Sequence, residues 1–218
     1  MKASSSRTLS AFEVLVAAVV IIGHNVFKVL PNEVLVLFVL GVMSVKVRDG
    51  GLGAMGFRRP ASWKRVIAIA LAAAALRIVL GAVVIEPVTA YFWPPAAAPA
   101  GSDDIPGNPV EALKWLLLVW TFAAFGEEIS YRGYLMTRVA DLGRRSTVAW
   151  VAALVVSSVL FGYGHYYKGP SGMLDSGIAG LILGGAYLLS GRVLWTSILA
   201  HGFIDTFGVM ASYLGWDS

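Results

Sequence analysis

Three ionisable side chains stand close together in the second half of a mostly apolar stretch of the sequence, Val110–Met136. They are Glu127, Glu128 and Arg132. A charged side chain at the centre of a membrane helix costs about 2.5–3.5 kcal/mol, so each of them needs a partner or a function. Glu128 and Arg132 are four residues apart and share a helix face, where they can pair. Glu127 projects about 100° away from Glu128 and has no obvious neutralising neighbour on its own helix, so it is suited to act as a general base.

Two later apolar stretches carry the remaining candidate residues. Thr147–Gly164 ends directly before His165, and Val193–Tyr213 contains His201 and Asp205, one turn apart on one helix face. Carboxylates and imidazoles are groups that activate water and stabilise an oxyanion during hydrolysis. A bundle that turns these faces inward would therefore collect one polar site within the membrane.

Each of these features also has a simpler structural explanation. Glu128 and Arg132 can form a structural ion pair. His165 can lie at the membrane interface, and His201 with Asp205 can form an interhelical hydrogen-bond clamp. Their coincidence on three of the late helices, which carry little other charge, favours a functional site. We interpret Glu13 and Arg77 as lone charges that are structural or extend toward the interface. His24 and Asn25, which close the first apolar stretch at the interface, have the same interpretation.

The composition predicts an integral membrane protein. Hydrophobic residues make up 57% of the 218 residues and charged residues 14%, whereas soluble proteins carry about 25% charged residues. These values exclude a soluble enzyme, a disordered linker and a disulfide-stapled secreted domain. The absence of Cys excludes a thiol nucleophile and thiolate metal ligands. The basic residues form short runs between apolar stretches rather than one continuous face, which argues against a nucleic-acid partner.

Seven apolar stretches predict an all-α, polytopic membrane bundle of about seven transmembrane helices. They are Phe12–Phe27, Val34–Val47, Val66–Ile85, Val110–Met136, Thr147–Gly164, Met173–Ser190 and Val193–Tyr213. Most are near the length of about 20 residues that crosses a hydrocarbon core of about 30 Å. The segment Glu86–Pro109, with its six Pro residues, is predicted to be a loop.

The loop charges predict the orientation of the bundle. Acidic residues gather on one side, at Glu86, Asp103 and Asp104. Basic residues gather on the other side, at Lys2, Arg7, Lys46–Arg65, Arg138, Arg144, Arg145 and Arg192. Because basic loops remain in the cytoplasm, we expect a cytoplasmic N-terminus and an outer C-terminus.

Three short patterns resemble those of the CPBP family of intramembrane proteases, which is also known as the Abi or CAAX-protease-and-bacteriocin-processing family. Glu-Glu-x-x-x-Arg is met by Glu127, Glu128 and Arg132, Phe-x-x-x-His by Phe161 and His165, and His-x-x-x-Asn/Asp by His201 and Asp205. The resemblance is close over Val110–Gly208, and the first half matches in hydropathy only. Many members of the family carry Asn where this chain has Asp205.

The resemblance implies peptide-bond hydrolysis inside the bilayer by a catalytic core in the last four helices. Residues 1–109 would then be N-terminal transmembrane helices and loops, and residues 110–218 the catalytic bundle. Glu127 and His165 would activate a water molecule. His201 and Asp205 would stabilise the tetrahedral oxyanion, and Glu128 with Arg132 would orient the site.

The family is commonly described as one of metalloproteases, and the residues leave two mechanisms open. Glu127, His165 and His201 could bind a divalent metal such as zinc with one open coordination position. They could also act without a metal, as base and oxyanion donors. Of the two we favour the second, and the sequence indicates no other cofactor.

Other protease chemistries find less support. The sequence has no His-Glu-x-x-His, so the usual zincin helix is absent. Gly169-Pro-Ser171-Gly172 resembles the Gly-x-Ser-Gly of rhomboid serine proteases, but a turn that caps the sixth helix is favoured. Ser176, Gly180 and Gly184 form a ridge of small residues, which we interpret as a close helix contact.

The sequence therefore predicts an intramembrane endopeptidase in a bacterial inner membrane. Its partners would be the lipid bilayer and a membrane-associated or prenylated protein or peptide substrate, with no nucleic acid. The main alternative is a catalytically silent scaffold or bacteriocin-immunity protein of the same fold. A proton-coupled transporter is the third possibility. It is less favoured because many transporter folds contain internal repeats, and none is visible in this sequence.

Overall fold

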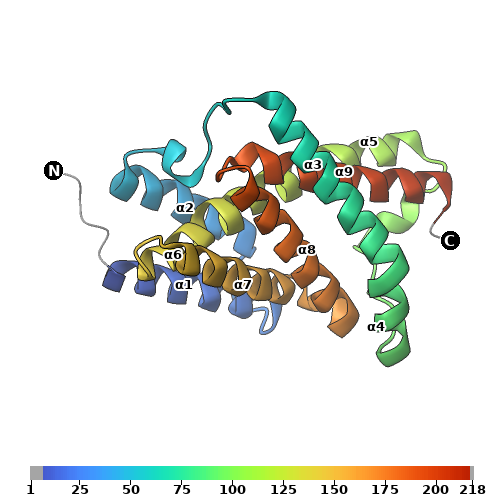
Figure 1. Ribbon diagram of the computed structural model, residues 1–218. Coiled ribbons are helices and arrows are strands. Elements are labelled where there is room, and N and C mark those ends of the chain that lie inside the picture. Colours follow the sequence, from blue (N-terminus) through green and yellow to red (C-terminus); the bar gives the residue numbers. More distant parts are fainter. Residues whose placement is uncertain (1–6, 217–218) are drawn as a thin grey trace.

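The computed structural model describes residues 7–216, and these residues form a bundle of helices without a strand. Long helical segments follow one another along the chain (Figure 1). They are α1 (Arg7–Asn25), α2 (Glu33–Asp49), α3 (Trp63–Leu80) with η2 (Gly81–Ile85) and α4 (Glu86–Phe92), α5 (Pro109–Leu118) with η4 (Val119–Leu135) and α6 (Met136–Leu142), α7 (Thr147–Gly164), α8 (Gly169–Leu189) and α9 (Leu194–Leu214). Each predicted apolar stretch corresponds to one of these segments, which confirms the all-α bundle.

The third segment is longer than the sequence predicts. It runs without a break over the 30 residues Trp63–Phe92, so the prediction of a loop was wrong for Glu86–Phe92. A proline inside a helix removes one backbone donor and clashes with the carbonyl four residues earlier. Here the π-helical turn η2 lies directly before Pro87, and its wider backbone gives the ring room.

The fourth segment, Pro109–Leu142, is also one continuous helix and contains 34 residues. Asn108 begins it, because its side chain accepts hydrogen bonds from the backbone N–H groups of Val110 and Glu111. Its middle part, η4, is π-helical over 17 residues. Such turns usually occur singly and often at functional sites. The first predicted motif lies within this part.

Five of the described segments are long and apolar enough to cross a membrane. They are Arg7–Asn25, Trp63–Phe92, Pro109–Leu142, Thr147–Gly164 and Tyr166–Leu189. Many of their large apolar side chains face outward, among them Leu15, Leu71, Val79 and Val155. An outer surface of this kind is stable in lipid and unfavourable in water, so the chain is an integral membrane protein.

Small residues let α7 and α8 approach closely, as the ridge on the sixth predicted helix indicates. A Cβ atom added at Gly180 would lie 3.0 Å from the Cα atom of Ser158 on α7. A Cβ atom added at Gly184 would collide with the side chain of Leu154. Close contact between small residues is a main source of helix association in membranes.

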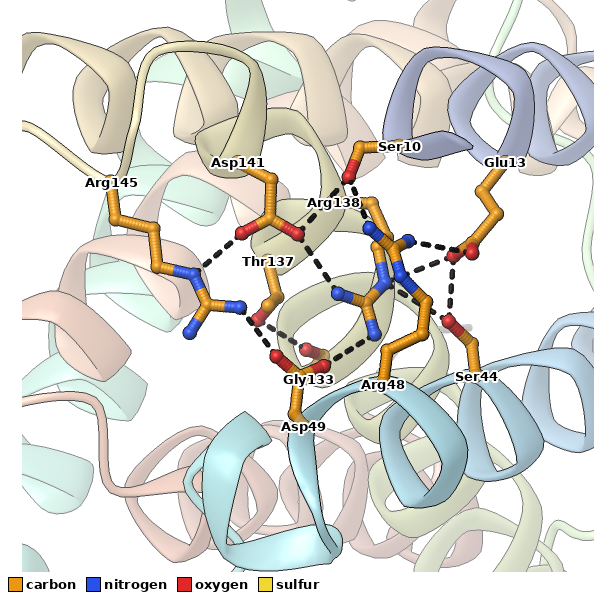
Figure 2. A network of polar contacts seen from close by, with 10 residues as sticks. All are labelled: Ser10, Glu13, Ser44, Arg48, Asp49, Gly133, Thr137, Arg138, Asp141 and Arg145. Carbon is orange, nitrogen blue, oxygen red and sulfur yellow. Dashed lines mark hydrogen bonds and ion pairs between the residues drawn. The ribbon is translucent and has the colours of Figure 1, made fainter. Parts of the chain in front are cut away.

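A network of ion pairs joins the first two helices to α6 (Figure 2). Arg138, on α6, has 0% of its surface exposed. Its guanidinium contacts Asp49 at 2.6 Å, Asp141 at 2.8 Å and Glu13 at 2.9 Å. Each carboxylate therefore belongs to a different part of the chain, on α2, α6 and α1, and one arginine holds all three.

Two further arginines complete this network. Arg145, in the connection between α6 and α7, contacts Asp141 at 2.6 Å and Asp49 at 2.8 Å. Arg48 contacts Glu13 at 2.7 Å. A buried charge with several close partners is tolerated, whereas an unpaired one is strongly unfavourable.

The ion pairs correct three interpretations made from the sequence. Glu13 and Arg77 are not lone charges, because Glu13 belongs to the network and Arg77 contacts Asp175 of α8 at 2.5 Å. Arg138 is not a loop residue, because the helix continues to Leu142. The sequence could not reveal these partners, since each lies far away along the chain.

Arg138→Met should destabilise the protein by about 3–5 kcal/mol, because it leaves buried carboxylates without their shared cation. The matched control is Arg58→Met, which removes an exposed arginine that donates one hydrogen bond to Gly191 O and should cost about 1 kcal/mol. Unfolding by SDS titration in detergent micelles, followed by circular dichroism, measures both. Equal stability of the two variants would contradict a stabilising role for the network.

Candidate active site

Glu128 lies at the centre of the candidate site and is completely buried. Its Oε1 accepts a hydrogen bond from Arg132 Nη1 at 2.7 Å and lies 2.8 Å from His201 Nδ1. Arg132 is on the same helix, η4, whereas His201 comes from α9. An ionised carboxylate only accepts hydrogen bonds, so Nδ1 of His201 is the protonated donor. Glu128 therefore joins the first and the third predicted motifs.

The guanidinium of Arg132 is held by more than this ion pair. Its Nη2 donates to the backbone carbonyl of Gly180 on α8 at 3.3 Å. Its Cζ lies 4.4 Å from the ring centroid of Phe161 on α7, which is a cation–π contact. The ion pair on η4 thus contacts α7, α8 and α9 at once.

Phe161 and His165 bring the second motif to the same place. The Phe161 ring lies 4.7 Å from the ring of His165 and 6.2 Å from the ring of His201, between centroids. His165 Nδ1 lies 2.9 Å from the carbonyl oxygen of Phe161. Because a carbonyl can only accept, Nδ1 carries the hydrogen and Nε2 is the nitrogen that can take up a proton.

A close approach of α9 to η4 lets His201 reach Glu128. A Cβ atom added at Gly202 would collide with the indole of Trp120. The indole Nε1 in turn donates to Thr206 Oγ1 at 3.1 Å. Only a residue without a side chain fits at position 202, directly beside the histidine.

Glu127, His165, His201 and Asp205 all line one cavity of about 670 Å³. Glu127 Oε2 is buried and has no hydrogen-bond partner among the described residues. Leaving a buried polar atom without a partner costs about 1–3 kcal/mol, and more for a charged group. The cavity offers the space in which a water molecule or a substrate can provide that partner.

Asp205 stands on the other side of His201. Its Oδ2 lies 3.5 Å from His201 Nε2, and its side chain is 25% exposed. The imidazole therefore lies between two carboxylates, with the short contact to Glu128 and the longer one to Asp205. It can satisfy both only when both ring nitrogens carry hydrogen.

Three cavity residues were not among the predicted site residues. Tyr131, Glu33 and His24 all line the cavity. The hydroxyl of Tyr131 is buried and lacks a hydrogen-bond partner among the described residues. Glu33 is 6% exposed, and its Oε2 lies 3.4 Å from His24 Nε2. We interpreted His24 and Asn25 as structural residues at the interface, whereas both line the cavity.

Gly164 keeps Tyr131 and Glu33 close together. A Cβ atom added there would lie 2.7 Å from the hydroxyl of Tyr131 and 3.6 Å from Glu33 Oε1. Tyr131 follows Glu127 by four residues, so a shared helix face was the signal that could have identified it. Glu33 carries no such signal, because it stands at the start of a helix capped by Asn32, where acidic residues are common.

Ser171 does not lie in this cavity. Its hydroxyl donates to the backbone carbonyl of Pro94 at 2.8 Å, and Ser171 belongs to the first turn of α8. It thereby fixes the α4–α5 loop against α8. This contact supports the structural interpretation of Gly169-Pro-Ser171-Gly172.

The arrangement does not fit a catalytic zinc site. Among residues 7–216, no three His, Cys, Asp or Glu side chains come together in a group that could hold a metal ion. Both ring nitrogens of His201 face carboxylates, and Nδ1 of His165 faces a carbonyl. Catalytic zinc needs three protein ligands around one point. Glu127, His165 and His201 do not provide them in this arrangement.

Comparisons with known proteins agree with the geometry. Searches among curated proteins and among solved structures gave no match for this chain. Residues 109–207 match a family model described as Rce1-like, type II CAAX prenyl endopeptidase. The match begins with the first residue of α5, contains all three motifs, and confirms the resemblance to the CAAX proteases. Over residues 109–207, slightly less than half of its length, the chain is therefore similar to the Rce1-like family of type II CAAX prenyl endopeptidases.

Proposed function

We propose that this protein is an intramembrane endopeptidase in which Glu127 activates the attacking water without a metal. One observation carries the proposal, namely the buried and unpartnered Oε2 of Glu127 beside the cavity. Oε2 of its neighbour Glu128 also lacks a partner among the described residues, but Glu128 is engaged through Oε1 by Arg132 and His201 and does not line the cavity. This leaves Glu127 as the carboxylate available for catalysis. His165 Nε2 is the second group that can accept a hydrogen bond from the same water.

The remaining groups complete the hydrolysis. Glu127 removes a proton from water, and the hydroxide forms a bond to the carbonyl carbon of the substrate. The oxyanion is stabilised by His201 Nε2–H, whose contact with Asp205 at 3.5 Å is long enough to be shared. Glu127 then gives the proton to the leaving nitrogen, and the C–N bond breaks. Asp205 and Glu128 hold His201 in its charged form throughout.

The lining of the cavity supports a membrane-associated or prenylated protein or peptide as the substrate. Besides the polar residues, its wall is apolar along α5, η4 and α9. The apolar lining residues there include Trp115, Leu118, Val119, Phe122, Ile204 and Val209. A site that is polar at one end and apolar along one wall suits a peptide with a lipid-soluble anchor.

The proposal includes the placement of the chain in the cell. We place the protein in a bacterial inner membrane, and the basic loops favour a cytoplasmic N-terminus. Residues 110–218 would form the catalytic bundle, and residues 1–109 would supply the wall that contains His24 and Glu33.

A catalytically silent scaffold or immunity protein of the same fold is the second candidate. It has no need for an unpartnered buried carboxylate, which is expensive to maintain. A transporter would use the same carboxylates to carry protons, but the sequence lacks the internal repeat typical of such folds. Loss of cleavage in a Glu127 variant separates the enzyme from both.

Glu127→Gln should reduce cleavage at least 100-fold, since the amide cannot take up a proton from water. Because Glu127 Oε2 has no partner to lose, the stability in detergent should be unchanged. The assay is the release of fragments in proteoliposomes from two probes, a farnesylated CAAX peptide and a single-span membrane protein. Activity within a few-fold of the unmodified protein would refute Glu127 as the base.

Glu128→Gln, unlike Glu127→Gln, should reduce the stability of the protein by about 3–5 kcal/mol, because it leaves the buried Arg132 without its ion-pair partner. Glu111→Gln provides the matched control. Glu111 pairs with Lys114 three residues along the same continuous helix, where the Lys114 side chain is 65% exposed, and its loss should cost about 1 kcal/mol or less. If Glu128→Gln is as stable as Glu111→Gln, Glu128 does not hold the site together.

Tyr131→Phe removes an unpartnered hydroxyl and keeps the ring, which packs against Phe161 with a centroid distance of 5.0 Å. We expect unchanged or slightly higher thermal stability and about 10-fold lower cleavage, the value of one hydrogen bond to the substrate. Tyr134→Phe, on the same helix and outside the cavity, is the control and should keep full activity. Full activity of Tyr131→Phe would show that its hydroxyl does not contact the substrate.

A further inference from the structure

The cavity opens at one end of the bundle. Three connections meet there and supply exposed lining residues: Lys28 between α1 and α2, Pro99 between α4 and α5, and Tyr167 in η5 (Tyr166–Lys168). Leu118 of α5 and Gly208 of α9 are exposed lining residues as well. The backbone N–H of Ala97 donates to the carbonyl of Lys168 at 3.3 Å, which joins two of these connections. We call this the mouth end.

The other end of the bundle is basic. There Arg58 Nη2 donates to Gly191 O at 3.1 Å and Arg65 Nη2 to Leu189 O at 3.2 Å. The network around Arg138 lies at this end too, because it holds the last residues of α2 and α6 (Figure 2). We call this the basic end, and its cations are Lys46, Arg48, Arg58, Arg59, Lys64, Arg65, Arg138, Arg144, Arg145 and Arg192.

A membrane thickness separates the two ends. α8 begins beside the mouth at Gly169 and finishes at Leu189, at the basic end, after 21 residues. At 1.5 Å per residue this is about 30 Å, the thickness of a hydrocarbon core. The mouth end has two lysines, Lys28 and Lys168, together with the exposed Asp103 and Asp104 of the α4–α5 loop. It therefore carries far fewer cations than the basic end.

From this charge difference we propose that the cavity opens to the extracytoplasmic side of the membrane and takes extracytoplasmic juxtamembrane segments of membrane proteins as substrates. Basic loops of membrane proteins stay in the cytoplasm, which places the basic end there and the mouth outside. The substrate class rests on the proposed endopeptidase function, whereas the orientation does not.

This orientation restricts what can be cleaved. A lipid-anchored tail of a cytoplasmic protein lies in the leaflet beside the basic end, a whole bilayer away from the mouth. A segment that leaves a transmembrane helix on the outer side can enter between the three connections directly. Its apolar part can then lie along Trp115, Leu118 and Phe122, and its polar backbone near Glu127 and Tyr131.

The absence of Cys from the chain allows a direct test by single-cysteine labelling of the full-length protein. Ala98→Cys introduces a thiol at an exposed cavity residue of the mouth end, and Ala61→Cys introduces one at an exposed residue of the basic end. The two variants are matched in the residue replaced. Each is treated with a membrane-impermeant maleimide in intact cells and, separately, after permeabilisation.

We expect Ala98→Cys to be labelled in intact cells and Ala61→Cys only after permeabilisation. The reverse pattern, labelling of both thiols in intact cells, or labelling of neither until permeabilisation would overturn the proposed orientation. A second mouth variant, Asp103→Cys, guards against a local effect at position 98 and should behave like Ala98→Cys.

A cleavage assay separates the substrate class from the endopeptidase function. Two single-span probes carry the same peptide, one beside the outer end and one beside the cytoplasmic end of the span, and are co-expressed with the protein. We expect cleavage of the outer probe only, and none with Glu127→Gln. Cleavage of only the cytoplasmic probe would overturn the proposed substrate class and leave the endopeptidase function intact. If the protein is not an endopeptidase, neither probe is cleaved, while the cysteine labelling pattern stays the same.

Discussion

The shared carboxylate oxygen of Glu128 is the contact on which the rest of the site depends. Charges buried in an apolar bundle are stable only when each is matched at short range. Oε1 of Glu128 matches Arg132 and His201 at once, at 2.7 and 2.8 Å. Through these partners it fixes η4 against α9, while Arg132 extends the connection to α7 and α8. The two adjacent glutamates thus have different tasks, because Glu128 forms ion pairs with Arg132 and His201, whereas Glu127 faces the cavity.

The first two helices do more than anchor the protein. They lie outside the part that matches the family, yet His24, Asn32 and Glu33 form one wall of the cavity. The ion network at the other end of the same helices holds them against α6 (Figure 2). The ion network holds these two helices at points about one membrane thickness away from the cavity. The cavity wall can therefore keep its position without direct bonds to the catalytic groups.

Much of the fold and the core of the site follow from short-range patterns. Apolar runs of membrane-spanning length define the helices, and i, i+4 spacing identifies pairs such as Glu128 with Arg132 and His201 with Asp205. Contacts between distant parts of the chain leave no such pattern. The partner of Arg77 is Asp175, 98 residues away, and Glu33 reaches the cavity only because of how the first hairpin docks. The long π-helical part and the continuation of a helix through Pro87 were also not predicted, because a proline in a sequence normally marks the end of a helix.

The ion network has a consequence for biosynthesis. Its N-terminal members, Glu13, Arg48 and Asp49, sum to one negative charge, and its later members, Arg138, Asp141 and Arg145, sum to one positive charge. During insertion into the membrane, Asp49 therefore has neither of its two arginine partners until the ribosome has made Arg138, and it has both only after Arg145. The network that joins the first two helices to α6 can therefore close only after α6 and the connection to α7 have been synthesised.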